Sequence, residues 1–188
     1  SVLPYAAQTF SGVDDRVISM AWLRMKNDRG NYRGLMSLPT ELSLEKEGND
    51  YKICFAPAKE LENLEAGWYD SLKSTISPEG QACKIVLTPK AGTKGEWRLT
   101  IGSLRLTADF YSNILSIEDT ETHVYYVREG ISTEQEISFI FDQEVIEVFA
   151  ENGKVYGAAE TEENILGMDW EVFRTEDLKI SEKMCLYK

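Results

Sequence analysis

The sequence of 188 residues contains a single histidine, His123, and three cysteines, Cys54, Cys83 and Cys185. A multi-histidine metal site, or a triad with histidine as base, would have to be built on that one residue. The cysteines are odd in number, widely spaced and form no CxxC pair, so neither a disulfide framework nor a zinc site is expected. We therefore expect no metal and no cofactor, and the run THVYYV predicts an ordinary strand position for His123.

No apolar run approaches the ~20 residues that a membrane-spanning helix needs, and no basic-then-apolar leader opens the chain. We therefore expect no membrane partner, and the protein is either cytosolic or has lost an upstream leader. Helical periodicity is also nearly absent. The stretch PAKELENLEAG, residues 57–67, is the exception, and with Leu61 and Leu64 three apart it predicts a short helix or connector.

The net charge of −12 is carried by one part of the chain. Residues 118–188 hold 18 Asp and Glu against 6 Lys and Arg, whereas residues 1–117 hold 14 of each. Such a surface repels phosphate backbones and anionic lipid, so nucleic acid is not expected as a partner and a neutral ligand suits the chain better. The simplest interpretation of these acids is a solvated face.

Strand patterns fill most of the chain, which is 43% hydrophobic. Turn-rich stretches with Gly, Asn and Asp separate four strand candidates in the first 56 residues, which predicts an antiparallel sheet of four strands. The run VISMAWL is apolar at nearly every position, which indicates a strand covered on both faces. The four candidates are PYAAQTF, RVISMAWLRM, LMSLPTELSL and DYKICFA.

The remainder of the chain predicts a β-sandwich of roughly nine or ten strands. Several segments are long enough to be hairpins, with IGSL, FDQEV and AENGK as turns, and Asn152-Gly153 supplies the positive φ of a tight turn. The fold class is therefore all-β: residues 1–60 form the first sheet and residues 61–188 the sandwich.

Three runs, YAAQTFSG, RVISMAWLRM and YRGLMSLPTELSL, resemble the last blade of the five-bladed propeller in glycoside hydrolase family 32. This family contains the invertases, levanases and inulinases, which cleave β-fructosides. PAKEL resembles the exit from that propeller, and ISFIFDQEVIEVFAENGK resembles the long hairpin of the family's C-terminal sandwich, with Gln143 and Glu144 replacing its usual Arg or Ser near the turn. The resemblance implies one propeller-type blade of four strands followed by the C-terminal β-sandwich domain.

The catalytic motifs of that family are missing from this chain. A retaining glycosidase needs two carboxyl groups ~5 to 5.5 Å apart, and the resemblance places them in WMNDPNG-like, RDP and EC motifs, none of which occurs here. Asn27-Asp28 and Asn49-Asp50 superficially resemble one motif, but they lie among turn residues, where Asn and Asp are expected for backbone reasons. We expect no catalytic residue. The acids of FDQEVIEVF, which are Asp142, Glu144 and Glu147, are interpreted as surface acids rather than as a pair across a hairpin.

The resemblance places three residues near the substrate of an intact enzyme. Trp22 would form part of the apolar wall against a fructosyl unit, with Tyr5 and Gln8 nearby. Packing between blades is an equally good role for Trp22. Core packing is also preferred over sugar stacking for four aromatic residues of the sandwich: Trp68, Trp97, Tyr111 and Trp170.

Two functional hypotheses follow from these residues. In the first, the chain is the accessory C-terminal region of a β-fructosidase and is inert alone. In the second, it is a carbohydrate-binding module whose sandwich holds a neutral glycan; an enzyme with an unrecognised site is a third possibility. A lone blade exposes apolar surface, so we also expect a homodimer formed through residues 5–56.

Overall fold

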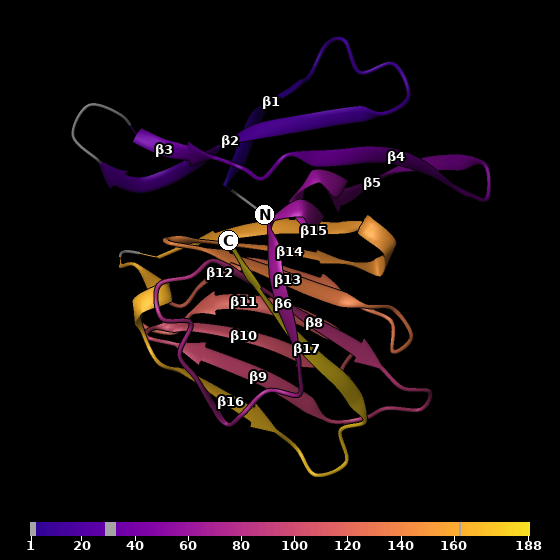
Figure 1. Cartoon of the computed structure of the whole chain (residues 1–188). Coiled ribbons are helices and arrows are strands. Elements are labelled where there is room, and N and C mark those ends of the chain that lie inside the picture. Colours follow the sequence, from indigo (N-terminus) through magenta and orange to yellow (C-terminus); the bar gives the residue numbers. More distant parts are fainter. Residues whose placement is uncertain (1–2, 29–32, 162) are drawn as a thin grey trace.

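The computed structural model describes residues 3–28, 33–161 and 163–188, with the backbone alone for 26–28 and 33. These residues form three antiparallel sheets, one of five strands and two of six. The predicted all-β class, a first sheet followed by a sandwich, is confirmed (Figure 1). No helix in the described ranges is long and apolar enough to cross a membrane.

The N-terminal sheet has the order β1-β2-β4-β5, with β3 also paired to β2. Its long central strand buries Ala21, Leu23 and Met25 on one face, whereas Met20 and Trp22 on the other face are half-buried. The run VISMAWL predicted that both faces of this strand are covered. In the structure only one of the two faces is fully covered. The strands are β1 (Pro4–Thr9), β2 (Val17–Asp28), β3 (Arg33–Met36), β4 (Thr40–Glu47) and β5 (Asp50–Pro57).

The predicted strand LMSLPTELSL is interrupted, which gives the sheet five strands instead of four. Pro39 has no N–H to donate to a ladder, and it lies between the end of β3 and the start of β4. Ser37 keeps the contact with β2, because its N–H donates to the Ala21 carbonyl and its hydroxyl accepts from the Ala21 N–H, at 2.8 and 2.9 Å. The amide of Leu38 is therefore available for a partner outside the sheet.

The expected connector is the short 3-10 helix η1 (Lys59–Leu64). Arg16, at the entry to β2, forms ion pairs with Glu41 of β4 and with Glu60 of η1. The connector is thereby tied to the N-terminal sheet before the chain enters the first strand of the sandwich.

The sandwich consists of two six-stranded sheets, with the orders β12-β11-β10-β9-β16-β7 and β15-β14-β13-β8-β17-β6. Twelve strands replace the nine or ten expected. They are β6 (Glu65–Asp70), β7 (Thr75–Ile76), β8 (Cys83–Pro89), β9 (Glu96–Ile101), β10 (Leu104–Asp109), β11 (Ile114–Asp119), β12 (Val124–Gly130), β13 (Ile137–Asp142), β14 (Val145–Ala150), β15 (Val155–Glu160), β16 (Trp170–Arg174) and β17 (Ile180–Tyr187). The 3-10 turns η2 (Glu151–Gly153) and η3 (Ile165–Gly167) complete it.

Aromatic side chains fill the space between the two sheets. Trp97 stacks on Phe139 with ring centroids 5.7 Å apart, and Trp170 lies 4.5 Å from Phe141 and donates its indole N–H to the Ile165 carbonyl. Both indoles are fully buried, so core packing is confirmed for these two residues. The same prediction is wrong for Trp68 and Tyr111, which are exposed because Trp68 lies on an edge strand and Tyr111 in a turn.

The predicted hairpin turns are found where the local sequence places them. Gly102, Gln143, Asn152 and Gly153 have φ values of 55°, 46°, 55° and 89°, as tight turns require. His123 differs from its prediction: it has a φ of 57° and ends the turn before β12 instead of lying within the strand.

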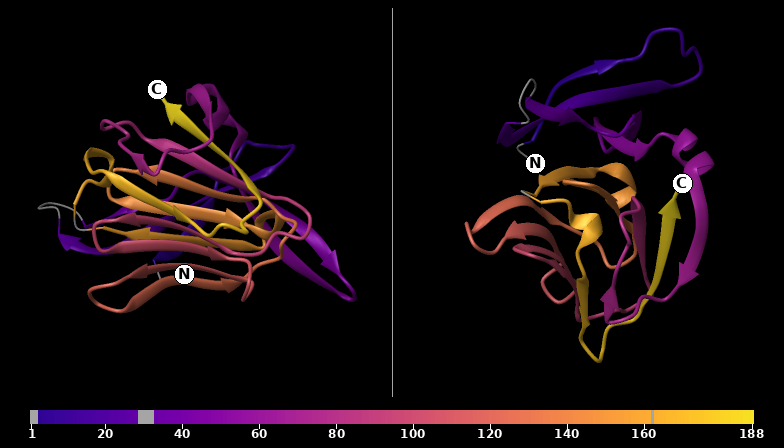
Figure 2. Two further views of the ribbon diagram at one scale, coloured as in Figure 1. Left: turned by 90° about the horizontal axis from the view of Figure 1, so that it is seen from below. Right: turned by 60° about the vertical axis from the view of Figure 1, so that its left-hand side comes forward.

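The N-terminal sheet packs on the outer face of the sandwich, beside β14 and β15 (Figures 1 and 2). Leu38 and Phe55 from the N-terminal sheet contact a cluster formed by Ile140, Phe149 and Tyr187. The strand β14 is therefore covered on both faces, which explains why all six of its residues, Glu147 included, are buried.

Candidate functional site

Tyr5, Gln8 and Trp22 lie on one face of the β1-β2 pair. Tyr5 is directly opposite Trp22, and Gln8 is opposite Met20, two residues earlier on the same strand. Between Tyr5 and Gln8, β1 has one residue more than the facing part of β2, and a bulge with Ala6 at a φ of 48° accommodates it. Gln8 therefore points to the same face of the sheet as Tyr5. The structure thus brings the three candidate residues together, although their role toward a substrate stays a prediction.

Trp22 is held from two sides. The Tyr5 ring meets the indole edge-on at 6.4 Å, and the Arg24 guanidinium lies 4.7 Å from the centre of the Tyr5 ring. On the β3 side, a Cβ at Gly34 would lie 2.2 Å from the indole nitrogen and 2.3 Å from the Leu23 carbonyl. The indole therefore depends on a glycine, which lets β3 approach closely, and packing within the sheet accounts for part of its role.

The three hairpin acids have separate environments. Asp142 is exposed and Glu144 is partly exposed, but Glu147 is only 3% exposed, so its interpretation as a surface acid is wrong. Its Oε1 accepts a hydrogen bond of 2.7 Å from the Leu38 N–H, and its Oε2 accepts one of 2.6 Å from the Tyr156 hydroxyl. Glu147 thus joins the sandwich to the break between β3 and β4.

Burial dominates the electrostatics of this junction. It raises the pKa of Glu147 to about 7, an effect that the hydrogen bonds from Tyr156 and Leu38 oppose and the charge of Asp142 reinforces. Burial, followed by the neighbouring carboxylate, also raises the pKa of Tyr156. Glu147 and Tyr156 lie beneath the N-terminal sheet and bind each other and the Leu38 amide. A glycosidase instead needs two carboxyl groups that are close together and accessible to substrate, so Glu147 does not fit that role.

Phe55 provides the apolar part of the junction. Its ring stacks on Tyr156 with centroids 5.2 Å apart, and the Tyr156 ring lies 5.1 Å from Phe149. The backbone of Phe55 passes directly over Gly153, where a Cβ would come within 2.5 Å of the Phe55 carbonyl oxygen. A glycine is therefore needed at this position for close approach as well as for its φ.

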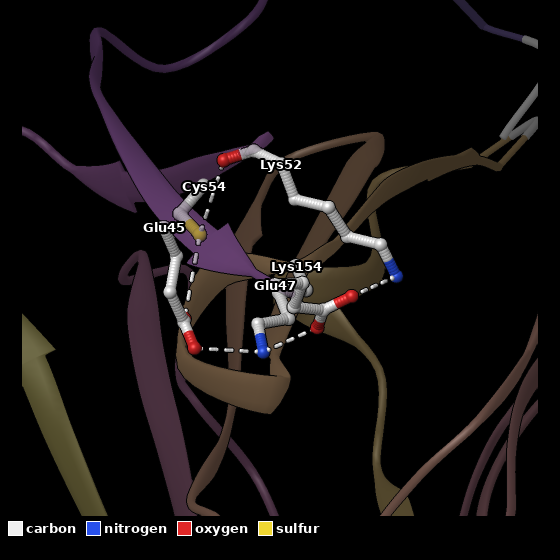
Figure 3. A network of polar contacts seen from close by, with 5 residues as sticks. All are labelled: Glu45, Glu47, Lys52, Cys54 and Lys154. Carbon is white, nitrogen blue, oxygen red and sulfur yellow. Dashed lines mark hydrogen bonds and ion pairs between the residues drawn. The ribbon is translucent and has the colours of Figure 1, made fainter. Parts of the chain in front are cut away.

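Lys154 provides the charged part of the junction (Figure 3). Its ammonium lies 2.9 Å from Glu45 and 2.8 Å from Glu47 of β4, and Lys52 lies 3.0 Å from Glu47. The hydrogen bond from Lys154 is the largest cause of a lowered pKa at Glu47. Because these groups are solvated, the ion pairs contribute orientation more than stability.

The remaining candidates lie at a turn and at strand ends. Asn49 lies in the β4-β5 turn and Asp50 begins β5, in agreement with a backbone role. Asn27 and Asp28 end β2 instead of lying in a loop, and their side chains are outside the described residues. Within the described ranges, no group of three or more His, Cys, Asp or Glu side chains could hold a metal ion. The three cysteines are buried free thiols.

The junction around Glu147 was missed by the sequence interpretation, although a signal for it exists. Glu147 interrupts the apolar run VIEVFA, and an acid flanked by apolar residues on both sides of a strand is a candidate for burial with a partner. Its partner, the Leu38 amide, is more than a hundred residues away in the sequence, and only pairing across the two parts of the fold identifies it.

No family model matches the sequence, and a search of curated proteins finds no match. Solved structures do match. An exo-inulinase from Aspergillus awamori superposes with a TM-score of 0.80 at 14% identity, over 99% of this chain and 43% of that one. A sucrose-6-phosphate hydrolase from Lactobacillus gasseri gives 0.73 at 16% identity, over 99% and 41% of the two chains.

A glycoside hydrolase family 32 structure from Bifidobacterium adolescentis also matches, with a TM-score of 0.73 at 19% identity, over 98% of this chain and 31% of that one. The chain therefore spans less than half the length of each of these structures. At these identities the likeness concerns the fold. The N-terminal sheet and the sandwich together have the fold of a part of structures in glycoside hydrolase family 32.

Proposed function

We propose that this chain is the C-terminal part of a β-fructoside-hydrolysing enzyme of glycoside hydrolase family 32, in which it supports the catalytic part without supplying its carboxyl groups. The observation that carries the proposal is the superposition of 99% of this chain on 43% of the exo-inulinase. The YAAQTFSG, RVISMAWLRM and YRGLMSLPTELSL runs support it independently, because they resemble the last propeller blade of that family.

The side chains of this chain support an accessory role. Of the three hairpin acids, the buried Glu147 is engaged by Leu38 and Tyr156, while Asp142 is exposed at the end of β13. The tightly packed junction of Phe55, Tyr156 and Gly153 fixes the N-terminal sheet to the sandwich. In this proposal, the sandwich holds the last blade in place, and that blade presents Trp22, Tyr5 and Gln8 toward the substrate.

The accessory role predicts that the isolated chain releases no fructose from sucrose, inulin or levan. Fructose release at the rate of the buffer blank is the expected result. Release above the blank that disappears in Asp142→Asn or Glu147→Gln would contradict it. The coding sequence upstream of Ser1 provides the second test, and we expect an in-frame region carrying the WMNDPNG-like, RDP and EC motifs. An upstream region that encodes an unrelated fold would overturn the proposal.

A further inference from the structure

The sandwich has one open side. The edge strands β12 and β15 pack against each other on one side, whereas the opposite edges are formed by β6 and the two-residue strand β7. β6 lies beside β17 at the margin of the molecule (Figure 2). Between these edges is a cleft of about 540 Å³, within the range of about 300–1,000 Å³ common for small-molecule sites.

An exposed aromatic ring lies at this cleft above an apolar floor. Tyr69 of β6 lines the cleft and is 57% exposed, and it is the register partner of Met184. Met184 and Ile76 are core residues that reach the cleft from the two sheets, and Leu186 lies beside them. The edge of the hydrophobic core therefore borders the cleft next to an exposed aromatic ring.

Besides Leu72 and Pro78, the rest of the cleft is lined by polar groups that carry no net charge together. The segment between β6 and β8 supplies the hydroxyl and amide groups, and it also supplies one cation, Lys73, and one anion, Glu79. The hydroxyl and amide residues are Ser71, Thr75, Ser77 and Gln81.

Contacts to the sandwich hold this segment in place before any ligand arrives. The Ser71 N–H donates to the Glu182 carbonyl at 2.9 Å, and the Gly80 N–H donates to the Leu166 carbonyl at 2.8 Å. The Arg174 guanidinium donates to the Leu72 carbonyl at 2.9 Å. A segment that is already ordered loses less conformational freedom on binding, so a ligand can be held with few contacts.

We propose that this cleft binds a neutral oligosaccharide, with the Tyr69 ring against the C–H face of one sugar and the hydroxyl and amide groups of the 71–81 segment bonded to sugar hydroxyls. An aromatic face, adaptable hydrogen-bonding groups and balanced charge are the chemistry that a neutral glycan needs. The net charge of −12 disfavours anionic ligands. The site lies wholly within the sandwich, so it is independent of the accessory role proposed above.

The test is a titration of the whole ¹⁵N-labelled chain with an inulin-type tetrasaccharide, a levan-type tetrasaccharide and cellotetraose. Saturable shifts of the Tyr69 amide and of amides in 71–81 are expected with at least one of the three. Absence of saturable shifts with all three, or saturable shifts confined to another surface, would overturn the proposal. Either result leaves the accessory role intact, because that role is tested by fructose release and by the upstream sequence.

Variants on one strand separate the platform from a general effect of exposed aromatic rings. Tyr69→Ala should weaken binding about fivefold to tenfold, and Tyr69→Phe should retain most of it, because the ring provides the stacking. Trp68→Ala is the matched control: Trp68 is the neighbouring residue, is 44% exposed and does not line the cleft. Unchanged binding in a folded Tyr69→Ala variant, or an equal loss in Trp68→Ala, would contradict the assignment. If Tyr69→Ala does not fold, the shifts of the wild-type chain decide.

Discussion

At the scale of single residues, the buried carboxyl group of Glu147 makes the stability of the protein depend on pH. Its pKa is about 7 in the folded chain against an ordinary value of 4.5. Between these values the unfolded chain has lost the proton that the folded chain keeps, so the contribution of Glu147 to stability falls as pH rises from 4.5 to 7 and is constant outside this range. The difference corresponds to about 3 kcal/mol.

Glu147→Gln should remove this pH dependence. The amide oxygen can still accept from the Leu38 N–H, and the Tyr156 hydroxyl can turn to accept from the amide nitrogen. Relative to wild type, the free energy of unfolding of the variant should therefore increase by about 2–3 kcal/mol between pH 4 and pH 8. Urea unfolding across this range measures it. If the difference in free energy of unfolding between the two proteins does not change with pH, the assignment is refuted. Tyr156→Phe removes a hydrogen-bond donor to the carboxylate, so it should extend the pH range over which stability falls to higher pH.

Gly153 tests the close approach of the N-terminal sheet. Gly153→Ala should lower the free energy of unfolding by about 2–4 kcal/mol, because the new Cβ meets the Phe55 backbone in addition to the strain of a positive φ. Gly92→Ala is the matched control, since Gly92 also has a positive φ but has open space around it, and it should cost only about 1 kcal/mol. If both variants lose the same free energy of unfolding, the Phe55 backbone can move away from a Cβ at position 153 at little cost, which would contradict a tightly packed junction.

At the scale of elements, the break between β3 and β4 connects the sheet to the sandwich. Because Pro39 ends the ladder, the Leu38 N–H can point to Glu147 while Ser37 maintains the pairing with β2. The interruption is thus the feature that supplies a donor for a buried carboxyl group on another sheet.

Trp22 acts within the packing of β1, β2 and β3. Trp22→Ala should lower the free energy of unfolding by about 1–3 kcal/mol, because the half-buried indole packs against Gly34 and Tyr5. Tyr5→Ala, at the more exposed partner, should cost less. Denaturant unfolding and fructan titration of each variant measure the two effects separately. A Trp22→Ala chain with wild-type stability and weaker fructan binding would show that the residue serves the ligand rather than the sheet.

At the scale of the whole molecule, apolar surface is concentrated on the N-terminal sheet. Half of the exposed large hydrophobic side chains of the described residues lie within the first 57 positions. Leu44 and Ile53 are paired across β4 and β5 and are 68% and 53% exposed. Burying ~400 Å² of such surface is worth on the order of 10 kcal/mol, and we propose that a second copy of the chain covers it.

Light scattering after size-exclusion chromatography should therefore give the mass of a dimer. The double variant Leu44→Lys, Ile53→Lys should give a folded monomer, because both side chains face solvent in the single chain. Its melting temperature should be lower than that of the dimer and independent of protein concentration, because the stabilisation from association is lost. Phe173→Lys, at an exposed position on the sandwich, should leave the dimer intact. A wild-type chain that remains monomeric at high concentration would end the proposal.

The sequence alone determined the local chemistry of this protein. Period-two and continuous apolar runs indicated strands, and the turns at Gly102, Gln143 and Asn152-Gly153 follow from the few residue pairs that adopt a positive φ easily. These signals lie within a few residues of one another, so a sheet followed by a sandwich could be predicted. The grouping of Tyr5, Gln8 and Trp22 came from the resemblance, and the bulge at Ala6 that aligns them is a structural result.

The tertiary structure decided which face each side chain occupies. Trp97 and Trp170 are buried while Trp68 is exposed, although nothing in their immediate sequence separates the three. Asp142 and Glu147 lie in one hairpin, yet only Glu147 is covered, because the N-terminal sheet packs over that part of β14. Whether a side chain is buried depends on packing between segments that can be a hundred residues apart in the sequence. A pattern within a few neighbouring residues cannot indicate such packing.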